Sequence, residues 1–167
     1  MRRVLGLFAY TLILIGCGSS ATGEAKIHWY DDREYQLYVY NLGNEPLLKI
    51  DVNYNGKSPR SGKDIQHSWQ NVDTDFYDVR IENISRYLIV IDHIEYVMGK
   101  GTLYSKHTKS AIDIKKDYGQ SHLSPGDVMR NDNAYVWAKD DNILHRIFVL
   151  DVEGKTIRAD IPLIYQR

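Results

Sequence analysis

The side chains that most often carry out chemistry are scattered along this sequence. Neither the H-E-x-x-H pattern of zinc proteases nor the G-x-S-x-G pattern of serine hydrolases occurs. The histidines are far apart in sequence, so a zinc site would have to be assembled entirely by the fold. We therefore predict no catalytic residue, no metal ligand and no cofactor. The six histidines are His28, His67, His93, His107, His122 and His145.

Two acidic segments are the next candidates for chemistry. One runs from Asp73 to Asp78 with three carboxylates, and the other is Asp140-Asp141-Asn142. Calcium needs six to eight oxygen ligands, and the first segment lacks the glycine and the distal glutamate of an EF-hand loop. We interpret both segments as solvated loops. A carboxylate pair for glycoside cleavage remains open as an alternative.

Tyrosine is the dominant aromatic residue. The sequence has 13 tyrosines against three phenylalanines and three tryptophans. Tyrosine combines an apolar ring with a hydroxyl group, which suits a partner surface or the stacking of a sugar. It also suits half-buried positions in a sheet. Both readings stay open for the N-terminal group, whose members are Trp29, Tyr30, Tyr35, Tyr38 and Tyr40.

The first residues have the order of a secretory signal peptide. Met1-Arg2-Arg3 is followed by an apolar run from Val4 to Ile15 and by Gly16-Cys17, which holds the sole cysteine. A positive start, a short apolar core and a small residue before the cleavage site define such peptides. The run of about 12 residues is shorter than the ~20 that span a bilayer as a helix.

Leu14-Ile15-Gly16-Cys17 resembles the lipobox of bacterial lipoproteins. The resemblance implies cleavage after Gly16, an S-diacylglycerol on Cys17 and a palmitoyl chain on its freed amine. A thiolate is a strong nucleophile, and two or three acyl chains hold a protein firmly where one does not. Gly18 stands where enterobacterial lipoproteins retained in the inner membrane carry aspartate. The resemblance therefore favours the outer membrane, facing the periplasm.

Charge and length narrow the class of protein further. Cleavage after Gly16 removes two of the 21 basic residues and none of the 22 acidic ones, which leaves a formal charge of −3. Because no basic patch dominates, we expect no nucleic-acid partner. The small, polar stretch after Cys17 reads as a tether. We predict a signal peptide at 1–16, a lipidated cysteine with flexible tether at 17–26, and one domain at 27–167.

The remaining sequence predicts strands. Leu48–Tyr54, Tyr77–Glu82 and Ile157–Tyr165 alternate apolar and polar residues with period two, and no 11-residue window shows a helical stripe. Leu88–Ile91 and much of Ile143–Val152 are apolar at both parities, which predicts cover on both faces. Asp92 falls on the apolar parity of its strand, which predicts a bulge.

Turn signals separate these strands. Pro125-Gly126 predicts a type II turn within Leu123–Asp127, and Glu153-Gly154-Lys155 predicts a hairpin. Pro162 has no amide hydrogen, so we expect the last strand at a sheet edge. Short strands with frequent turns favour an antiparallel sandwich or barrel.

Residues 77–167 resemble immunoglobulin-like domains of bacterial envelope proteins. The features are a strand ending in Asn83, the Pro125-Gly126 turn, and a late hairpin that closes with Gly154-Lys155. The cysteine pair of antibody domains is absent. The resemblance implies an all-β, antiparallel immunoglobulin-like β-sandwich.

These observations predict a lipid-anchored lipoprotein of the bacterial envelope that binds rather than catalyses. Its partners would be the membrane, through the lipid on Cys17, and envelope proteins or peptidoglycan. Alternatives are an envelope hydrolase or metal-dependent enzyme with a fold-assembled site, an accessory lipoprotein of a secretion or pilus machine, and a glycan binder that uses the tyrosine-rich face.

Overall fold

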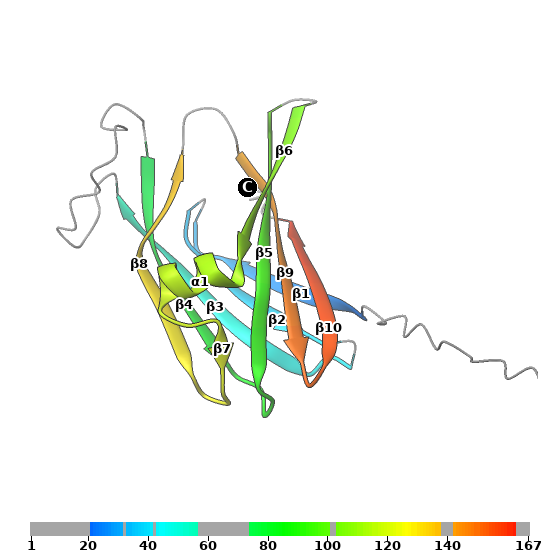
Figure 1. Cartoon of the computed structure of the whole chain (residues 1–167). Helices are drawn as coiled ribbons and strands as arrows, with labels where there is room; N and C mark the ends of the chain where they lie inside the picture. Colours follow the sequence, from blue (N-terminus) through cyan, green and yellow to red (C-terminus); the bar gives the residue numbers. More distant parts are fainter. Residues whose placement is uncertain are drawn as a thin grey trace, which may run out of the picture.

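The computed structural model describes residues 21–31, 33–41, 43–56, 74–100, 103–137 and 142–162. Strands dominate this part of the chain, as predicted, and one short helix accompanies them (Figure 1). The elements are β1 Ala21–Trp29, β2 Tyr35–Tyr40, β3 Pro46–Gly56, β4 Thr74–Asn83, β5 Ile89–Lys100, β6 Leu103–Ser110, α1 Ala111–Tyr118, β7 His122–Leu123, β8 Val128–Trp137, β9 Asn142–Val152 and β10 Lys155–Pro162.

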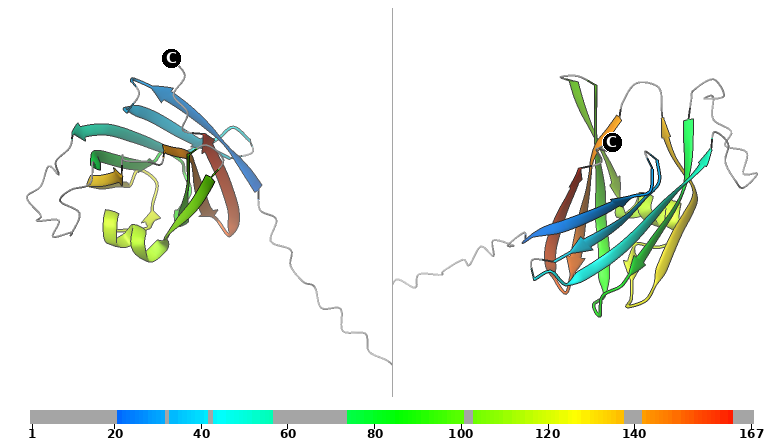
Figure 2. Two further views of the ribbon diagram at one scale, coloured as in Figure 1. Left: turned by 90° about the horizontal axis from the view of Figure 1, so that it is seen from above. Right: turned by 180° about the vertical axis from the view of Figure 1, so that it is seen from behind.

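The described strands form one mixed sheet that curls into a half-barrel. Its order is β6-β5-β9-β10-β1-β2-β3-β4-β8, with β7 paired to β5. β1 and β10 run parallel, and the other pairs are antiparallel. The predicted sandwich has two sheets, whereas here β1 bonds to β10 through Ala21–Gly23 and to β2 through Glu24–Trp29. This double pairing joins the two halves into one curled sheet (Figure 2).

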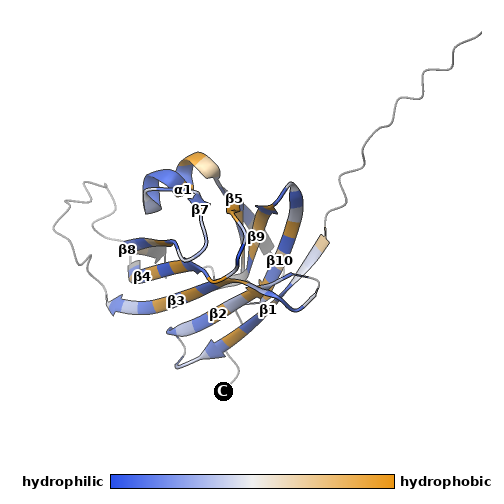
Figure 3. Cartoon of the chain, turned by 90° about the horizontal axis from the view of Figure 1, so that it is seen from below, coloured by the Kyte–Doolittle hydropathy of each residue, from blue (hydrophilic) through white to orange (hydrophobic). Residues whose placement is uncertain are grey.

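Alternation along the strands fills the concave side of the sheet with apolar residues. Apolar and polar positions alternate along most strands (Figure 3), as in β10, where Ile157, Ala159 and Ile161 are buried and their neighbours are exposed. The two halves share one core, to which β2, β3 and β4 contribute from one side and β5, β9 and β10 from the other. β9 is covered on both faces, as predicted, since all residues from Ile147 to Leu150 are buried.

The structure corrects the prediction that the flexible tether extends to residue 26. Residues 21–26 form the first part of β1. Gly23 is there for close packing, because a Cβ at this position would lie 2.9 Å from Ile157 Cγ2 and 2.9 Å from the Tyr40 carbonyl oxygen. Small residues that suggest flexibility in sequence here let two strands approach each other.

Helix α1 was not predicted, and it closes the open side of the half-barrel. It lies between the two edges of the sheet and contacts β5, β6 and β8 (Figure 2). Ser110 and Asp113 form a capping box, and Gly119 ends the helix with a φ of 84°. Ile114 is its one fully buried side chain. A helix of eight residues with one buried side chain shows no apolar periodicity in sequence, which explains why it was not predicted.

Local predictions had mixed outcomes. The register shifts between Ile91 and His93, as expected for a bulge at Asp92. Gly126 has a φ of 83°, and β9 and β10 form the expected hairpin. The edge position expected of Pro162 is wrong, because β10 lies between β9 and β1; Pro162 escapes the conflict because β1 pairs only as far as Ala159. The segment at Leu88 is not covered on both faces, since Leu88 is 51% exposed.

Candidate functional site

The concave side of the half-barrel changes character from one end to the other. The C-terminal ends of β1, β3, β5 and β8 and the N-terminal ends of β2, β4, β6 and β9 lie at one end of the half-barrel, which we call the upper end after its place in Figure 1. Toward the lower end the inward side chains are aliphatic, as at Ile91, Leu150 and Met129. Toward the upper end the same inward positions carry a cluster of tyrosines around one arginine. We call it the arginine–tyrosine cluster; its members are Tyr35, Tyr77, Tyr96, Tyr118 and Arg146.

Five elements position this cluster. Strand parity turns each of its strand residues inward: Tyr35 shares the buried parity of Leu37 on β2, and Tyr77 shares that of Val79 on β4. Tyr96 and Arg146 lie directly opposite each other on β5 and β9. Tyr118, at the end of α1, packs against the same core from the side that the sheet leaves open.

Arg146 and Tyr96 are in direct contact. The guanidinium carbon lies 5.2 Å from the centroid of the Tyr96 ring, a cation–π arrangement. The Arg146 Nε is inaccessible to solvent and has no hydrogen-bond partner. Burial lowers the pKa of Arg146, but the surrounding phenols raise it by more, so the net pKa lies above that of free arginine.

The phenols of the cluster are held in their neutral form. Burial raises the pKa of Tyr35 and that of Tyr118. Burial, with a contribution from Asp75, raises the pKa of Tyr77 to about 12. Near neutral pH the cluster therefore presents one fixed cation surrounded by protonated hydroxyl groups, which can donate hydrogen bonds.

Further aromatic side chains extend the cluster across the sheet onto β1 and β3, because Trp29 pairs with Tyr35 and Tyr54 pairs with Tyr77. The ring centroids of Trp29 and Tyr35 are 4.8 Å apart, and those of Tyr54 and Tyr77 are 5.6 Å apart. The Tyr54 hydroxyl donates to Asp75 over 3.1 Å, and the Arg33 guanidinium lies 4.6 Å from the centroid of the Tyr54 ring. Aromatic faces from β1 and β3 thus adjoin the cluster.

The structure divides the predicted tyrosine-rich face between two sides of the sheet. Trp29 and Tyr35 lie on the concave side, whereas Tyr38 and Tyr40 lie half-buried on the convex side of β2. Tyr30 sits at the end of β1, is 57% exposed and meets His28 edge to face. Because side chains of a strand alternate in direction, residues close in sequence do not form one surface here.

The described histidines do not gather at one place. His28, His107 and His122 are exposed on β1, β6 and β7, and His145 lies in β9. No group of three or more His, Cys, Asp or Glu side chains within the described ranges could hold a metal ion. Asp75 belongs to β4 rather than to a loop, and Asp78 also lies in β4, as the strand predicted for Tyr77–Glu82 indicates. His67, Asp73, Asp140 and Asp141 lie outside the described residues.

A charged network surrounds Glu95 on the convex side of β5. Lys106 lies 2.5 Å and Arg158 2.8 Å from its carboxylate, and His93 Nε2 lies 3.5 Å from it. Burial raises the pKa of Glu95, but the hydrogen bonds from Lys106 and Arg158 outweigh this and lower it to about 2. Every charge here has a partner, so the network ties β5 to β6 and β10.

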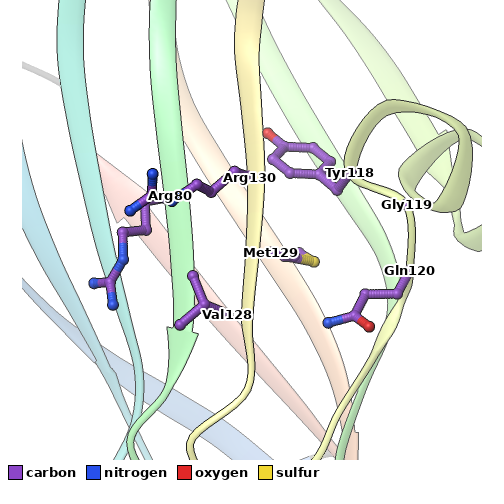
Figure 4. Close-up of a pocket in the computed structure, with 7 residues that line it drawn as sticks. All are labelled: Arg80, Tyr118, Gly119, Gln120, Val128, Met129 and Arg130. Atoms are coloured by element: carbon purple, nitrogen blue, oxygen red, sulfur yellow. The ribbon is translucent and has the colours of Figure 1, made fainter.

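An open pocket of about 610 Å³ lies at the edge strand β8, beside the C-terminal end of α1 (Figure 4). Arg80 and Val128 lie on one side of β8 in this view, and Tyr118 and Gln120 on the other. Arg80 is already paired with Glu82 at 2.6 Å and with Asp51 at 3.4 Å. The charge of Arg80 is thus largely neutralised, and Arg130, the other arginine of the pocket, is exposed to solvent; the pocket is therefore a weaker candidate than the arginine–tyrosine cluster, whose arginine has a buried Nε.

The predicted lipidation site, Cys17, and the cleavage site after Gly16 lie outside the described residues. No helix in the described part of the chain is long and apolar enough to cross a membrane.

Sequence reasoning missed four members of the cluster: Tyr77, Tyr96, Tyr118 and Arg146. One signal was available, because Arg146 is a charged residue on the same parity as Phe148, Leu150 and Val152, all of which are buried. The convergence of the tyrosines depends on strand pairing between distant segments and had no local signal.

Comparisons with known proteins give no function. No family model matches the chain, and no curated protein matches it. Among solved structures, the chain is similar to a Northeast Structural Genomics Consortium target, SoR45, with a TM-score of 0.40 and 9% sequence identity over 68% of this chain and 81% of that chain. A likeness of this degree carries no argument about function.

Proposed function

We propose that this chain is a lipid-anchored domain of the bacterial envelope that works by binding rather than by catalysis. The observation that carries the binding role is the arginine–tyrosine cluster, which places hydrogen-bond donors and aromatic faces inside the half-barrel at its upper end. In further support of binding over the metal-dependent alternative, no group of three or more His, Cys, Asp or Glu side chains among the described residues could hold a metal ion.

The lipid anchor rests on the order of residues from Met1 to Cys17. Since β1 begins at Ala21, four Cα steps separate the domain from Cys17. At full extension these steps reach about 14 Å. An acylated Cys17 would therefore hold the domain close to the membrane surface, where its partners would be envelope proteins or peptidoglycan.

We further propose that the half-barrel is a variant of the immunoglobulin-like sandwich. In support, the features behind the resemblance lie together: the Asn83 amide donates to the Asp127 carbonyl over 3.0 Å, and the Gly126 amide donates to the Asn83 carbonyl over 2.9 Å. The two halves of the sheet would be the two layers, with β1 crossing from one to the other.

The anchor is tested by expressing the full-length chain in a bacterium with two membranes and supplying a labelled fatty acid. We expect a labelled, shortened protein in the outer-membrane fraction, and an unlabelled, unshortened precursor for Cys17→Ala. Gly18→Asp, the matched control, should keep the label and move to the inner-membrane fraction. Label that persists in Cys17→Ala would refute the anchor.

The binding role is tested with purified peptidoglycan sacculi and with in-cell cross-linking. We expect the chain to sediment with sacculi or to cross-link to an envelope protein, without releasing soluble fragments from the sacculi. Release of muropeptides by the wild-type chain would support the hydrolase alternative instead. A cross-linked partner from a secretion or pilus machine would favour the accessory-lipoprotein alternative.

A further inference from the structure

Arg146 differs from Arg80 and Arg158 in having no counter-charge. Arg80 is paired with Asp51 and Glu82, and Arg158 is paired with Glu95. Within the described ranges no carboxylate forms an ion pair with Arg146, and its Nε has no hydrogen-bond partner. Its neighbours are four tyrosines, which supply rings and hydroxyl groups but no formal negative charge near neutral pH.

An uncompensated cation on the concave side of a sheet is expensive to bury. The contact with Tyr96 offsets part of this cost, since the ring face attracts the cation. The Nε–H group of Arg146 still has no acceptor. In the two-pronged contact of an arginine with a carboxylate or phosphate, this group can form one of the two hydrogen bonds. An anion would complete this site, whereas a cation would be repelled.

The surroundings favour an oxyanion on a small organic molecule. Tyrosine hydroxyl groups can donate to additional oxygens of the anion, and the raised pKa values of Tyr35, Tyr77 and Tyr118 keep these donors protonated. The rings of Trp29 and Tyr54 lie beside Tyr35 and Tyr77 of the cluster and can contact a flat or apolar group of the ligand. The lower end is filled by aliphatic core, so the ligand would extend toward the upper end.

We propose that the arginine–tyrosine cluster binds the carboxylate or phosphate group of a small molecule, with Arg146 as the anchoring residue and the tyrosine hydroxyl groups as further donors. This inference rests on the proposed binding function and names the chemical class of the ligand. The cluster is a binding site only, and no covalent step is assigned to it.

The test uses the full-length chain purified in detergent and its melting temperature at constant ionic strength. Sodium benzoate and sodium phosphate are titrated separately, with sodium chloride as the reference. We expect at least one of the two probes to raise the melting temperature in a saturable way at millimolar concentration. A response to benzoate alone identifies an organic carboxylate as the ligand class, and a response to phosphate alone identifies a phosphate or a phosphorylated molecule.

Variants connect this response to the cluster. Arg146→Met keeps an unbranched apolar stem and removes the guanidinium with its charge, so we expect the saturable rise to disappear. Arg146→Lys keeps the charge but loses the planar fork and should weaken the apparent affinity about tenfold. Tyr96→Phe keeps the ring and should weaken it less. Arg86→Met, at an arginine that is 76% exposed in the β4–β5 connection and is paired with Glu45, is the matched control and should respond as the wild type does.

Two results would overturn the inference. One is the absence of a saturable rise with either probe, and the other is an equal response in Arg146→Met and in the wild type. Because labelling of Cys17 and cross-linking to envelope partners do not depend on Arg146, the proposed function can stand if the oxyanion site fails. Loss of labelling and of cross-linking, with anion binding intact, would refute the proposed function and leave the site.

Discussion

Asn83 is the side chain whose removal should cost the most at the lower end of the half-barrel. It is fully buried at the end of β4. Its Nδ2 donates to the carbonyls of Tyr87 and Leu123, both over 2.7 Å. Its Oδ1 accepts from the Ser85 amide over 2.9 Å and from the Ser85 hydroxyl over 2.7 Å. One amide thus joins β4, the β4–β5 connection and β7.

Replacing Asn83 with alanine should lower the free energy of unfolding by about 3–5 kcal/mol. Each satisfied hydrogen bond contributes about 1 kcal/mol net, and each buried group left without a partner costs about 1–3 kcal/mol. In the variant, the carbonyls of Tyr87 and Leu123 and the amide of Ser85 lose the hydrogen bonds that the Asn83 side chain makes with them. For a domain of this size the melting temperature should fall by roughly 10–15 °C.

Urea unfolding followed by circular dichroism measures this loss, provided that the slope with denaturant stays constant. Asn53→Ala is the matched control, because Asn53 is exposed on β3 and should change stability by less than about 0.5 kcal/mol. Asn83→Asp adds a second signature. Its carboxylate would face two carbonyl oxygens, which raises its pKa in the folded state, so its deficit against the wild type should shrink as the pH falls. A loss in Asn83→Ala no larger than in the control would refute this account of the lower end.

Three further outcomes are expected. The ionised form of Glu95 stabilises the fold fully above about pH 4.5, and this contribution is lost as the pH falls toward its folded pKa of about 2; acid unfolding of Glu95→Gln should therefore be less steep than that of the wild type over this window. Gly23→Ala should cost about 1–3 kcal/mol in urea unfolding, because the added methyl group meets Tyr40 and its partner strand, whereas a neutral result would return residues 21–26 to a tether. Ile114→Ala should cost about 2–4 kcal/mol and speed proteolytic cleavage near α1, since Ile114 is the buried anchor of the helix; unchanged cleavage would contradict its role in closing the sheet.

Period-two alternation predicted the strands well because it reports which face of a strand is buried. Ile50, Val52, Val79 and Ile81 all lie in the core as their parity indicates. The same signal located the bulge at Asp92. It could not show that β1 pairs with β10, which lies near the other end of the sequence, because pairing between distant segments leaves no local pattern. The number of sheets was therefore beyond the reach of the pattern.

The candidate site was predictable only in part. The charge of Arg146 on a buried parity is visible in the sequence, and it marks an inward position that needs explanation. Which tyrosines surround it depends on the pairing of β5 with β9 and on the place of α1 across the open side. Of the tyrosines that lie close together in sequence, Tyr35 faces the concave side, whereas Tyr38 and Tyr40 face the convex side together, with ring centroids 6.4 Å apart.

The place of β1 within the sheet has a mechanical consequence. If the N-terminal side of this strand is fixed to a membrane, any tension between the membrane and a bound partner is applied along β1. The strand is then held by two ladders in succession, to β10 over Ala21–Gly23 and to β2 over Glu24–Trp29, and the ladder to β10 takes the load first. The pairing of β1 with both halves of the sheet would thus resist unfolding at the strand on which the force acts.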